Sequence, residues 1–206
     1  MIIKKAEFIT SVAHEKDFLS FDKPVIAVAG KSNVGKSSFI NMLANQNKLA
    51  KTSNTPGRTR LINYFDFGEF VLADLPGYGF AKVSKSEKDK WARLMERYFE
   101  TSKIANVFLL LDVRHKPTAE DVQMINYLYH YALPFTLIAT KVDKLGKSKI
   151  KPELKNLANY LKVGEQNVLG TSATSRYGKE NVLDRIENII KVFAEGEYVE
   201  EEWNTK

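Results

Sequence analysis

The sequence predicts an α/β fold of three layers, in which helices cover both faces of a mainly parallel sheet and one antiparallel hairpin lies at its edge. Strand-like apolar runs alternate with helix-like segments through the second half of the chain, an order that is typical of parallel sheets. Residues 25–29 form a short apolar run that leads directly into a glycine-rich loop and a helix. Residues 61–67 and 70–73 are separated only by Gly68 and Glu69, which indicates a hairpin.

The other elements follow from the spacing of apolar residues and from the residues at their ends. Strands are predicted at 6–12 (on the sheet edge), 107–111, 135–139 and 168–169. Helices are predicted from the glycine-rich loop to about 45–47, at 84–101, at 118–131, from a first turn that holds Pro152 to about Lys162, and at 178–193. Two pairs fit helix N-terminal caps, Ser84 with Glu87 and Thr118 with Asp121. We expect one domain over 1–194, a mobile segment at 78–81 and a fraying acidic tail at 195–206.

Length and composition restrict the class of protein. The 206 residues suit one α/β domain. The absence of cysteine excludes disulfides and thiolate metal sites. No apolar run approaches the ~18 residues of a membrane span, and residues 1–7 lack a signal-peptide core, so we expect a cytoplasmic protein. The histidines, His14, His115 and His130, show no metal-ligand spacing and are expected to be solvated or packed.

The charge is unevenly distributed along the chain. The formal net charge is +6, and the last twelve residues contain five Glu and one Lys, so the other 194 carry +10. A basic body indicates a polyanionic partner such as RNA, although charge alone agrees equally well with a protein that binds no nucleic acid. The basic residues that we expect to meet RNA lie in a loop (Lys51, Arg58, Arg60), on one helix face (Lys85, Lys88, Lys90, Arg93, Arg97) and in the run 144–155.

The glycine-rich loop has the pattern of a phosphate-binding loop, which is Gly, four residues, Gly, Lys and Ser. It consists of Gly30, Lys31, Ser32, Asn33, Val34, Gly35, Lys36 and Ser37. Its glycines let the backbone turn several N–H groups into one concavity, and the helix N-terminus adds its positive dipole end. Lys36 is predicted to meet the β- and γ-phosphates, and Ser37 to offer its hydroxyl to Mg²⁺. The loop therefore predicts a P-loop NTPase fold.

Two further segments are predicted to act at the γ-phosphate. The first consists of Asp74, Leu75, Pro76 and Gly77 at the end of a strand. Asp74 would face Mg²⁺ through water, and the Gly77 N–H would face the γ-phosphate. The second is the polar loop 48–60, in which Thr59 would give its hydroxyl to Mg²⁺ and its N–H to the γ-phosphate. Thr52 and Thr55 remain alternatives on the residue pattern alone.

The base-binding candidates follow two later strands. They are Thr140, Lys141, Val142 and Asp143, and then Thr171, Ser172 and Ala173. The Asp143 carboxylate can accept two hydrogen bonds from guanine, from N1–H and the N2 amine, and adenine offers no such pair. The aliphatic stem of Lys141 can cover the base, and the 171–173 segment would place an N–H near guanine O6. Because parallel strands end at one edge of a sheet, we expect all four motifs around one nucleotide.

These motifs resemble the EngB (YihA/YsxC) family of bacterial translation-factor-class GTPases over about residues 5–194. The matching segments are 30–37, 55–59, 74–79, 140–143 and 171–173. The resemblance selects Thr59 among the loop threonines, and the predicted nucleotide contacts there are Gly57, Arg58, Thr59, Arg60 and Leu61. It implies a GTPase that binds GTP or GDP with Mg²⁺, hydrolyses GTP slowly with Lys36, Thr59 and Gly77 as catalytic residues, and acts in assembly of the large ribosomal subunit. It further implies contact with ribosomal RNA and a need in cell division and septation, and we expect a monomer.

Four positions depart from common GTPase patterns or add to them. Thr140 stands where GTPases generally have Asn, so base selectivity rests more on Asp143. Arg60 stands where many family members have Gln, which changes no predicted role. Tyr78 occupies the position at which many GTPases place a water-orienting Gln, which predicts slow hydrolysis by the free protein. Asn33 is predicted to help hold K⁺ near the phosphates, as in related GTPases that share it, or else only to stabilise its own loop.

Two other functions compete with a ribosome-assembly GTPase. The first is a P-loop kinase or ATPase, against which the 140–143 motif argues. The second is a division-site scaffold whose nucleotide pocket is only structural. Competition of GTP with ATP would test the first, and co-sedimentation with ribosomal particles or with division proteins would test the second.

Overall fold

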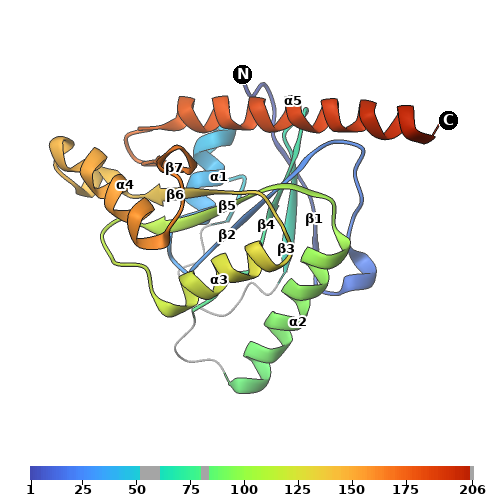
Figure 1. Ribbon diagram of the computed structural model, residues 1–206, viewed down its shortest axis with the longest axis horizontal. Helices are drawn as coiled ribbons and strands as arrows, with labels where there is room; N and C mark the ends of the chain where they lie inside the picture. Colours follow the sequence, from blue (N-terminus) through green and yellow to red (C-terminus); the bar gives the residue numbers. More distant parts are fainter. Residues whose placement is uncertain (52–60, 80–83, 205–206) are drawn as a thin grey trace.

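The computed structural model describes residues 1–51, 61–79 and 84–204, and within them the strands form a seven-stranded sheet (Figure 1). The strand order is β1-β3-β4-β2-β5-β6-β7. The strands are β1 Glu7–Val12, β2 Val25–Gly30, β3 Ile62–Asp66, β4 Val71–Asp74, β5 Ile104–Asp112, β6 Phe135–Thr140 and β7 Val168–Gly170. From β4 through β2 to β7 all neighbours are parallel, whereas β3 is antiparallel to both β1 and β4. The predicted parallel sheet, hairpin and edge strand are confirmed.

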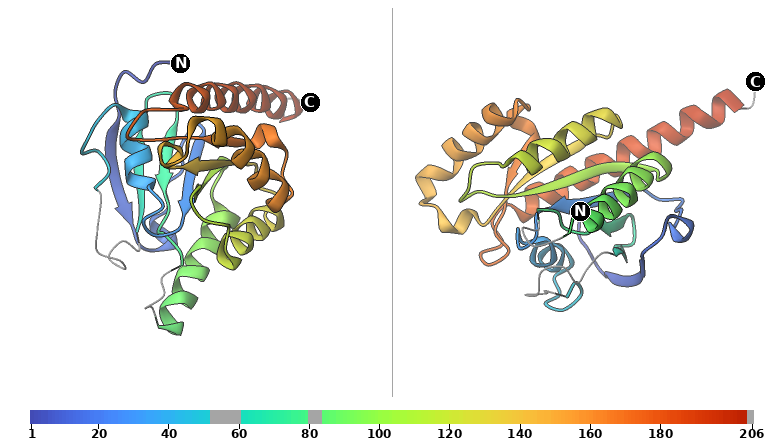
Figure 2. Two further views of the ribbon diagram at one scale, coloured as in Figure 1. Left: turned by 90° about the vertical axis from the view of Figure 1, so that its left-hand side faces the viewer. Right: turned by 90° about the horizontal axis from the view of Figure 1, so that it is seen from below.

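Five α-helices lie in the described ranges and cover both faces of the sheet. They are α1 Lys36–Ala44, α2 Lys85–Thr101, α3 Ala119–His130, α4 Lys147–Leu161 and α5 Lys179–Asn204. Helices α2, α3 and α4 pack on one face, and α1 and α5 pack on the other (Figures 1 and 2). None of these helices combines the length and the apolar composition that a bilayer span requires.

Strand β2 explains why the run before the phosphate loop is continuously apolar. Val25, Ala27 and Ala29 belong to the core layer beneath α2, α3 and α4. Ile26 and Val28, which alternate with them, belong to the layer beneath α1 and α5. A central parallel strand is buried on both faces, so every position must be apolar. The strand thereby fixes the phosphate loop at the centre of one sheet edge.

Two helix boundaries differ from those predicted. Helix α4 begins at Lys147, so Pro152 lies inside the helix and not in its first turn. The proline leaves the carbonyl of Ser148 without a helical partner, and Ser148 is exposed, so water can satisfy that carbonyl. Helix α5 continues to Asn204 and does not fray after Phe193. The Glu-rich segment favours helix, and the single Gly196 costs only ~1 kcal/mol.

Candidate nucleotide-binding site

The four predicted motifs lie together at the end of the sheet where the parallel strands have their carboxyl ends. Residues 30–37 connect β2 to α1, Asp74 ends β4, Thr140 ends β6, and Thr171 follows β7. Contacts join each motif to another. The predicted convergence of the four motifs is therefore present in the described part of the chain.

The phosphate loop is a tight turn that requires its glycines. Gly35 has a φ of 110° and directly precedes the first residue of α1. A Cβ on Gly30 would lie 2.8 Å from Val34 Cγ1 and 3.0 Å from the carbonyl oxygen of Leu110, so a side chain there would collide with the loop and with β5. Asn33 also has a positive φ, of 63°, a conformation that Asn adopts more readily than most residues. The loop thus presents the helix N-terminus and its N–H groups as an anion site.

The buried Asp74 carboxyl lies close enough to Lys36 to interact with its charge. Burial raises the pKa of the Asp74 carboxyl to about 6, and the charge of Lys36 and a hydrogen bond from Asn63 limit that rise. Asp74 Oδ1 is buried and has no hydrogen-bond partner among the described residues. A Cβ on Gly77 would lie only 3.2 Å from Lys36 Nζ, so the Gly77 segment lies directly beside the phosphate-loop lysine.

The oxygen atoms on this side suit Mg²⁺. Asp74 supplies the buried, unpartnered oxygen, and the Ser37 hydroxyl donates to the carbonyl of Lys51 at 3.0 Å, which leaves its lone pairs for a cation. Carboxylate and hydroxyl oxygens are the hard ligands that Mg²⁺ prefers. No cluster of three His, Cys, Asp or Glu residues suited to a metal occurs in the described ranges. The three histidines are exposed.

One predicted part of the site lies outside the described residues. It consists of Gly57, Arg58, Thr59 and Arg60, together with the rival threonines Thr52 and Thr55. Leu61 is described; it is partly buried and directly precedes β3.

Thr140 ties the base side to the phosphate loop. Its buried hydroxyl lies 2.8 Å from the carbonyl oxygen of Val34 and 3.2 Å from that of Leu111. The next residue, Lys141, has a φ of 62°, and its Nζ donates to the carbonyl of Asn33 at 2.9 Å. The threonine hydroxyl is therefore engaged by the backbone of the phosphate loop.

Asp143 is held next to the loop that follows β7. A hydrogen bond from Ser172 is the largest effect on the pKa of the Asp143 carboxyl and lowers it. Burial opposes this effect, and Lys144 adds to the lowering. The N–H of Val142 donates to the carbonyl of Thr171 at 3.2 Å, which joins the two segments predicted to bind the base. Ser172 is buried, and Ala173 is exposed. The Asp143 carboxylate is thus kept ionised, as an acceptor for two donors must be.

Asp112 is a site residue for which no role was predicted. It ends β5 between the phosphate and base motifs, and its carboxylate accepts Lys141 Nζ at 2.9 Å and Arg114 Nη2 at 2.7 Å. Burial alone would raise the pKa of Asp112, but the hydrogen bonds from Arg114 and Lys141 hold it well below its ordinary value. Its position at the end of a buried parallel strand is the signal that could have found it.

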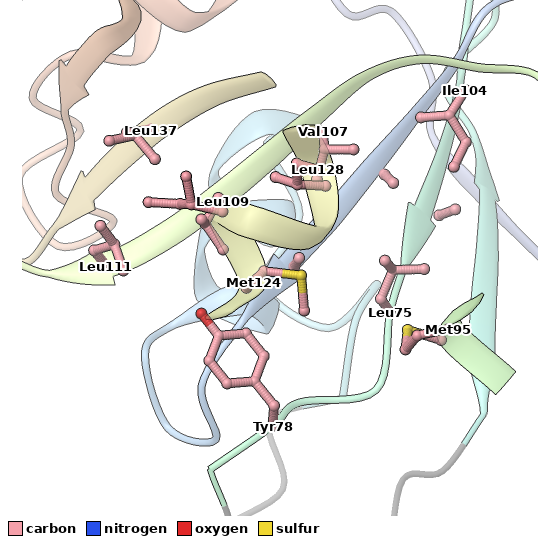
Figure 3. Close-up of a cluster of buried hydrophobic side chains, with 14 of the residues drawn as sticks. Leu75, Tyr78, Met95, Ile104, Val107, Leu109, Leu111, Met124, Leu128 and Leu137 are labelled. Carbon is pink, nitrogen blue, oxygen red and sulfur yellow. The ribbon is translucent and has the colours of Figure 1, made fainter. Parts of the chain in front are cut away.

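Tyr78 contradicts the prediction of a mobile segment. Its ring is buried in the same core cluster as Met124 and Leu75 (Figure 3), and its hydroxyl donates to Asp121 at 2.8 Å. Burial and the neighbouring Asp121 charge raise the pKa of this hydroxyl far above its usual range, so it stays protonated. Burial of the ring and its hydrogen bond fix Tyr78. Phe80 and Ala81, the rest of the predicted segment, lie outside the described residues.

This arrangement on a parallel sheet places the chain in the class of P-loop GTPases. Residues 25–141 match the family described as "50S ribosome-binding GTPase". A "Probable GTP-binding protein EngB" from Clostridium kluyveri is 44% identical over 94% of this chain and 100% of its own length. Another from Mycoplasma capricolum is 53% identical over 72% of this chain and 77% of its own length. A crystal structure of a probable GTP-binding protein engB has the same fold, with a TM-score of 0.64 at 22% identity over 81% of this chain and 98% of that one. The chain belongs to the EngB family of GTP-binding proteins, and this removes the kinase and ATPase alternative.

Proposed function

We propose that this protein is a Mg²⁺-dependent GTP switch that acts in assembly of the large ribosomal subunit. The observation that carries the proposal is the match of residues 25–141 to a family described as 50S ribosome-binding GTPases. A cytoplasmic, monomeric protein and a need in cell division and septation belong to the same proposal. The domain of the switch is residues 1–194, and 195–206 form an acidic extension of it.

On the phosphate side, the backbone of residues 30–37 binds the α- and β-phosphates, and Lys36 reaches the β- and γ-phosphates. Gly77 offers its N–H to the γ-phosphate, which its closeness to Lys36 Nζ supports. Ser37 and Thr59 hold Mg²⁺ directly, and Asp74 holds it through water. When bound, the ion neutralises charge that develops on the phosphate oxygens. Gly57, Arg58, Arg60 and Leu61 complete the loop around the nucleotide.

On the base side, Asp143 accepts hydrogen bonds from guanine N1–H and the N2 amine. Its low pKa and its contact with Ser172 support this role. The stem of Lys141 covers the base, and the backbone of 171–173 faces O6. Because the Thr140 hydroxyl is engaged by Val34, selectivity for guanine rests on Asp143.

Hydrolysis by the free protein is slow in this proposal. Many GTPases place a Gln at position 78 to orient the attacking water, whereas Tyr78 is buried and donates to Asp121. Its hydroxyl proton is therefore already engaged by Asp121. Lys36, Thr59 and Gly77 remain to stabilise the transition state, and a partner or a cation supplies what is missing.

The ribosomal RNA partner is supported by the exposed lysines at the start of α4. Lys147, Lys149 and Lys151 are exposed and form no ion pair in the described ranges. The first turn of α4 contains no acidic residue, although the dipole at a helix N-terminus disfavours cations. Phosphates of a bound RNA would offset that cost. On α2, by contrast, Arg97 is paired with Glu15 and Glu100.

Nucleotide-dependent co-sedimentation with large-subunit precursors tests the proposal. Binding in the presence of a non-hydrolysable GTP analogue, and weaker binding with GDP, is the expected result. Equal co-sedimentation with the GTP analogue and with GDP would contradict a role as a nucleotide switch. Recovery with division proteins and not with ribosomal particles would favour the scaffold alternative.

Salt dependence tests the RNA contact. If Lys147, Lys149 and Lys151 neutralise phosphates, the logarithm of the binding constant should fall linearly with the logarithm of salt concentration, by about 0.7–0.9 per phosphate. Reversing these three charges should reduce that slope and leave GTP affinity unchanged. Lys191→Glu, on α5 and the opposite face of the sheet, is the control. The same reversal of Lys85, Lys88 and Arg93 tests α2, and salt-independent binding would indicate a protein partner.

A further inference from the structure

A buried carboxylate at the start of α3 lies outside all the nucleotide-binding motifs. Asp121 accepts the Tyr78 hydroxyl at 2.8 Å, the N–H of Thr118 at 2.8 Å and the Thr118 hydroxyl at 2.9 Å. It is only 4% exposed. The N-terminal dipole of α3 adds to these donors in stabilising the charge. One rigid helix turn therefore holds the residue that follows Gly77.

The phosphate loop reaches the same turn of α3. Lys31 Nζ donates to the Thr118 hydroxyl at 2.7 Å and lies 3.3 Å from Glu120. The Lys31 side chain passes across Gly79, where an added Cβ would collide with Lys31 Cε. Lys31 and Tyr78 are thus two independent links, from the phosphate loop and from the Gly77 segment, to one anchor.

The two linked segments are also joined through their backbones. The N–H of Ser32 donates to the carbonyl of Tyr78 at 3.1 Å, and the N–H of Tyr78 lies 3.4 Å from the carbonyl oxygen of Gly30. These bonds continue the parallel pairing of β2 with β4 beyond the strand ends. On the other side, Trp91 of α2 donates to the carbonyl of Pro76 at 3.1 Å. Gly77 therefore lies in a segment fixed from three directions.

We propose that Asp121 is a positioning residue for GTP hydrolysis, which acts through Tyr78 to hold the Gly77 N–H beside Lys36. This role rests on the proposed function of Gly77 at the γ-phosphate. Donors that are already in place at the transition state cost no reorganisation when the reaction occurs. In this proposal the buried Tyr78 hydroxyl holds the Gly77 segment through its hydrogen bond to Asp121, which a phenylalanine at this position could not form.

Tyr78→Phe tests the role, since it removes one hydroxyl and keeps the ring. We expect the single-turnover rate of GTP hydrolysis to fall about tenfold. The affinity for a non-hydrolysable GTP analogue relative to GDP should fall about threefold, with GDP affinity unchanged, because only the triphosphate reaches Gly77. The control is Tyr98→Phe, which removes another buried hydroxyl from the same core layer, on α2. It should leave both quantities unchanged.

A second variant connects the effect to Asp121. Asp121→Ala should reproduce the Tyr78→Phe effect, and adding it to Tyr78→Phe should change the rate by less than threefold, because residues in one network are not additive. If Asp121→Ala does not fold, Tyr78→Phe alone decides. The positioning role would be overturned if Tyr78→Phe left unchanged, or increased, the affinity for the GTP analogue relative to that for GDP. That result would not contradict the proposed function. Failure of the unmodified protein to bind guanine nucleotide would overturn both.

Discussion

The phosphate side and the base side of the site differ in how far the protein satisfies its own polar groups. On the base side, Thr140, Lys141 and Asp143 each have a partner within the protein. On the phosphate side, Asp74 is buried, its pKa is raised to about 6 by burial, and its Oδ1 has no partner among the described residues. A buried oxygen without a partner costs ~1–3 kcal/mol. On the phosphate side, a cation with its water shell can therefore remove the free-energy cost of the unpartnered Asp74 oxygen. On the base side, the polar groups already have partners.

This difference indicates a division of labour. In the proposed function, a preformed base side selects guanine in either nucleotide state, because the base is the same in GTP and GDP. The phosphate side would respond to the γ-phosphate and to Mg²⁺, so we expect its stability to depend on them. If the two sides behave separately, variants on one side should leave the properties of the other unchanged.

Lys36→Ala should produce the largest loss, about 100- to 1000-fold in affinity for both GTP and GDP, or about 3–4 kcal/mol. The variant removes the charge that meets the phosphates and also the cation that limits the rise of the Asp74 pKa. Titration with fluorescent nucleotides measures it. Lys147→Ala, an exposed lysine on α4, is the control. Affinities within threefold of the unmodified protein would show that Lys36 does not meet the phosphates.

Asp143→Asn should affect the base side alone. The loss of the two-donor match to guanine should lower GTP and GDP affinity equally, by about 10- to 100-fold, or about 1–3 kcal/mol, and raise affinity for xanthosine triphosphate. Competition between GTP and xanthosine triphosphate measures the change in their relative affinities. Asp184→Asn, an exposed carboxylate on α5, is the control. Unchanged GTP affinity in the Asp143 variant would remove this residue from the base site.

Asp112→Asn should lower the free energy of unfolding by about 1–2 kcal/mol at pH 7, a value discounted because Arg114 is largely exposed. The pKa of Asp112 is held below its ordinary 3.8 in the folded protein. The folded state therefore binds fewer protons than the unfolded state in acid, and the stabilisation is present above about pH 4 and lost as pH falls below it. Urea unfolding at pH 7 and at pH 3 measures the difference between the two proteins. A difference that stays constant over this range would contradict the charge-assisted role.

The sequence predicts the fold and the meeting of the motifs well, because these depend on local patterns. The apolar run of β2, the glycines of the phosphate loop and the alternation of strands and helices each act over a few residues. The Asp121–Tyr78 pair could not be predicted in this way, because its members lie 43 positions apart. Only the packing of α3 against the Gly77 segment brings them together.

Two local signals were outweighed by effects from other parts of the chain. We expected a mobile segment at 78–81, but burial of the Tyr78 ring and its hydrogen bond to Asp121 fix that residue. Pro152 indicated a helix start, but the lysine-rich segment before it already has helical conformation from Lys147. Packing fixes Tyr78. The free-energy cost of Pro152 inside α4 is smaller than the contribution of the neighbouring helix-forming residues.

The smallest expected effect concerns Asn33 and K⁺. Its backbone carbonyl accepts Lys141 Nζ, but its side chain makes no hydrogen bond within the described residues and is exposed. The alternative, in which the side chain only stabilises its own loop by hydrogen bonding, therefore has no contact to support it. If the side-chain oxygen helps to hold K⁺ near the β- and γ-phosphates, single-turnover hydrolysis should be about fivefold faster in K⁺ than in Na⁺ at equal ionic strength.

The choice of variant decides whether this experiment is clean. Asn33 has a φ of 63°, so Asn33→Ala would add backbone strain of about 1 kcal/mol that has nothing to do with the cation. Asn33→Gly removes the side-chain oxygen and keeps that conformation accessible, and it should make the rates in K⁺ and Na⁺ equal without lowering GDP affinity. Equal rates in both salts for the unmodified protein, with and without ribosomal particles, would reject the potassium role. Fast GTP hydrolysis by the free protein in Na⁺ would contradict the proposal that hydrolysis is slow because position 78 is a buried Tyr.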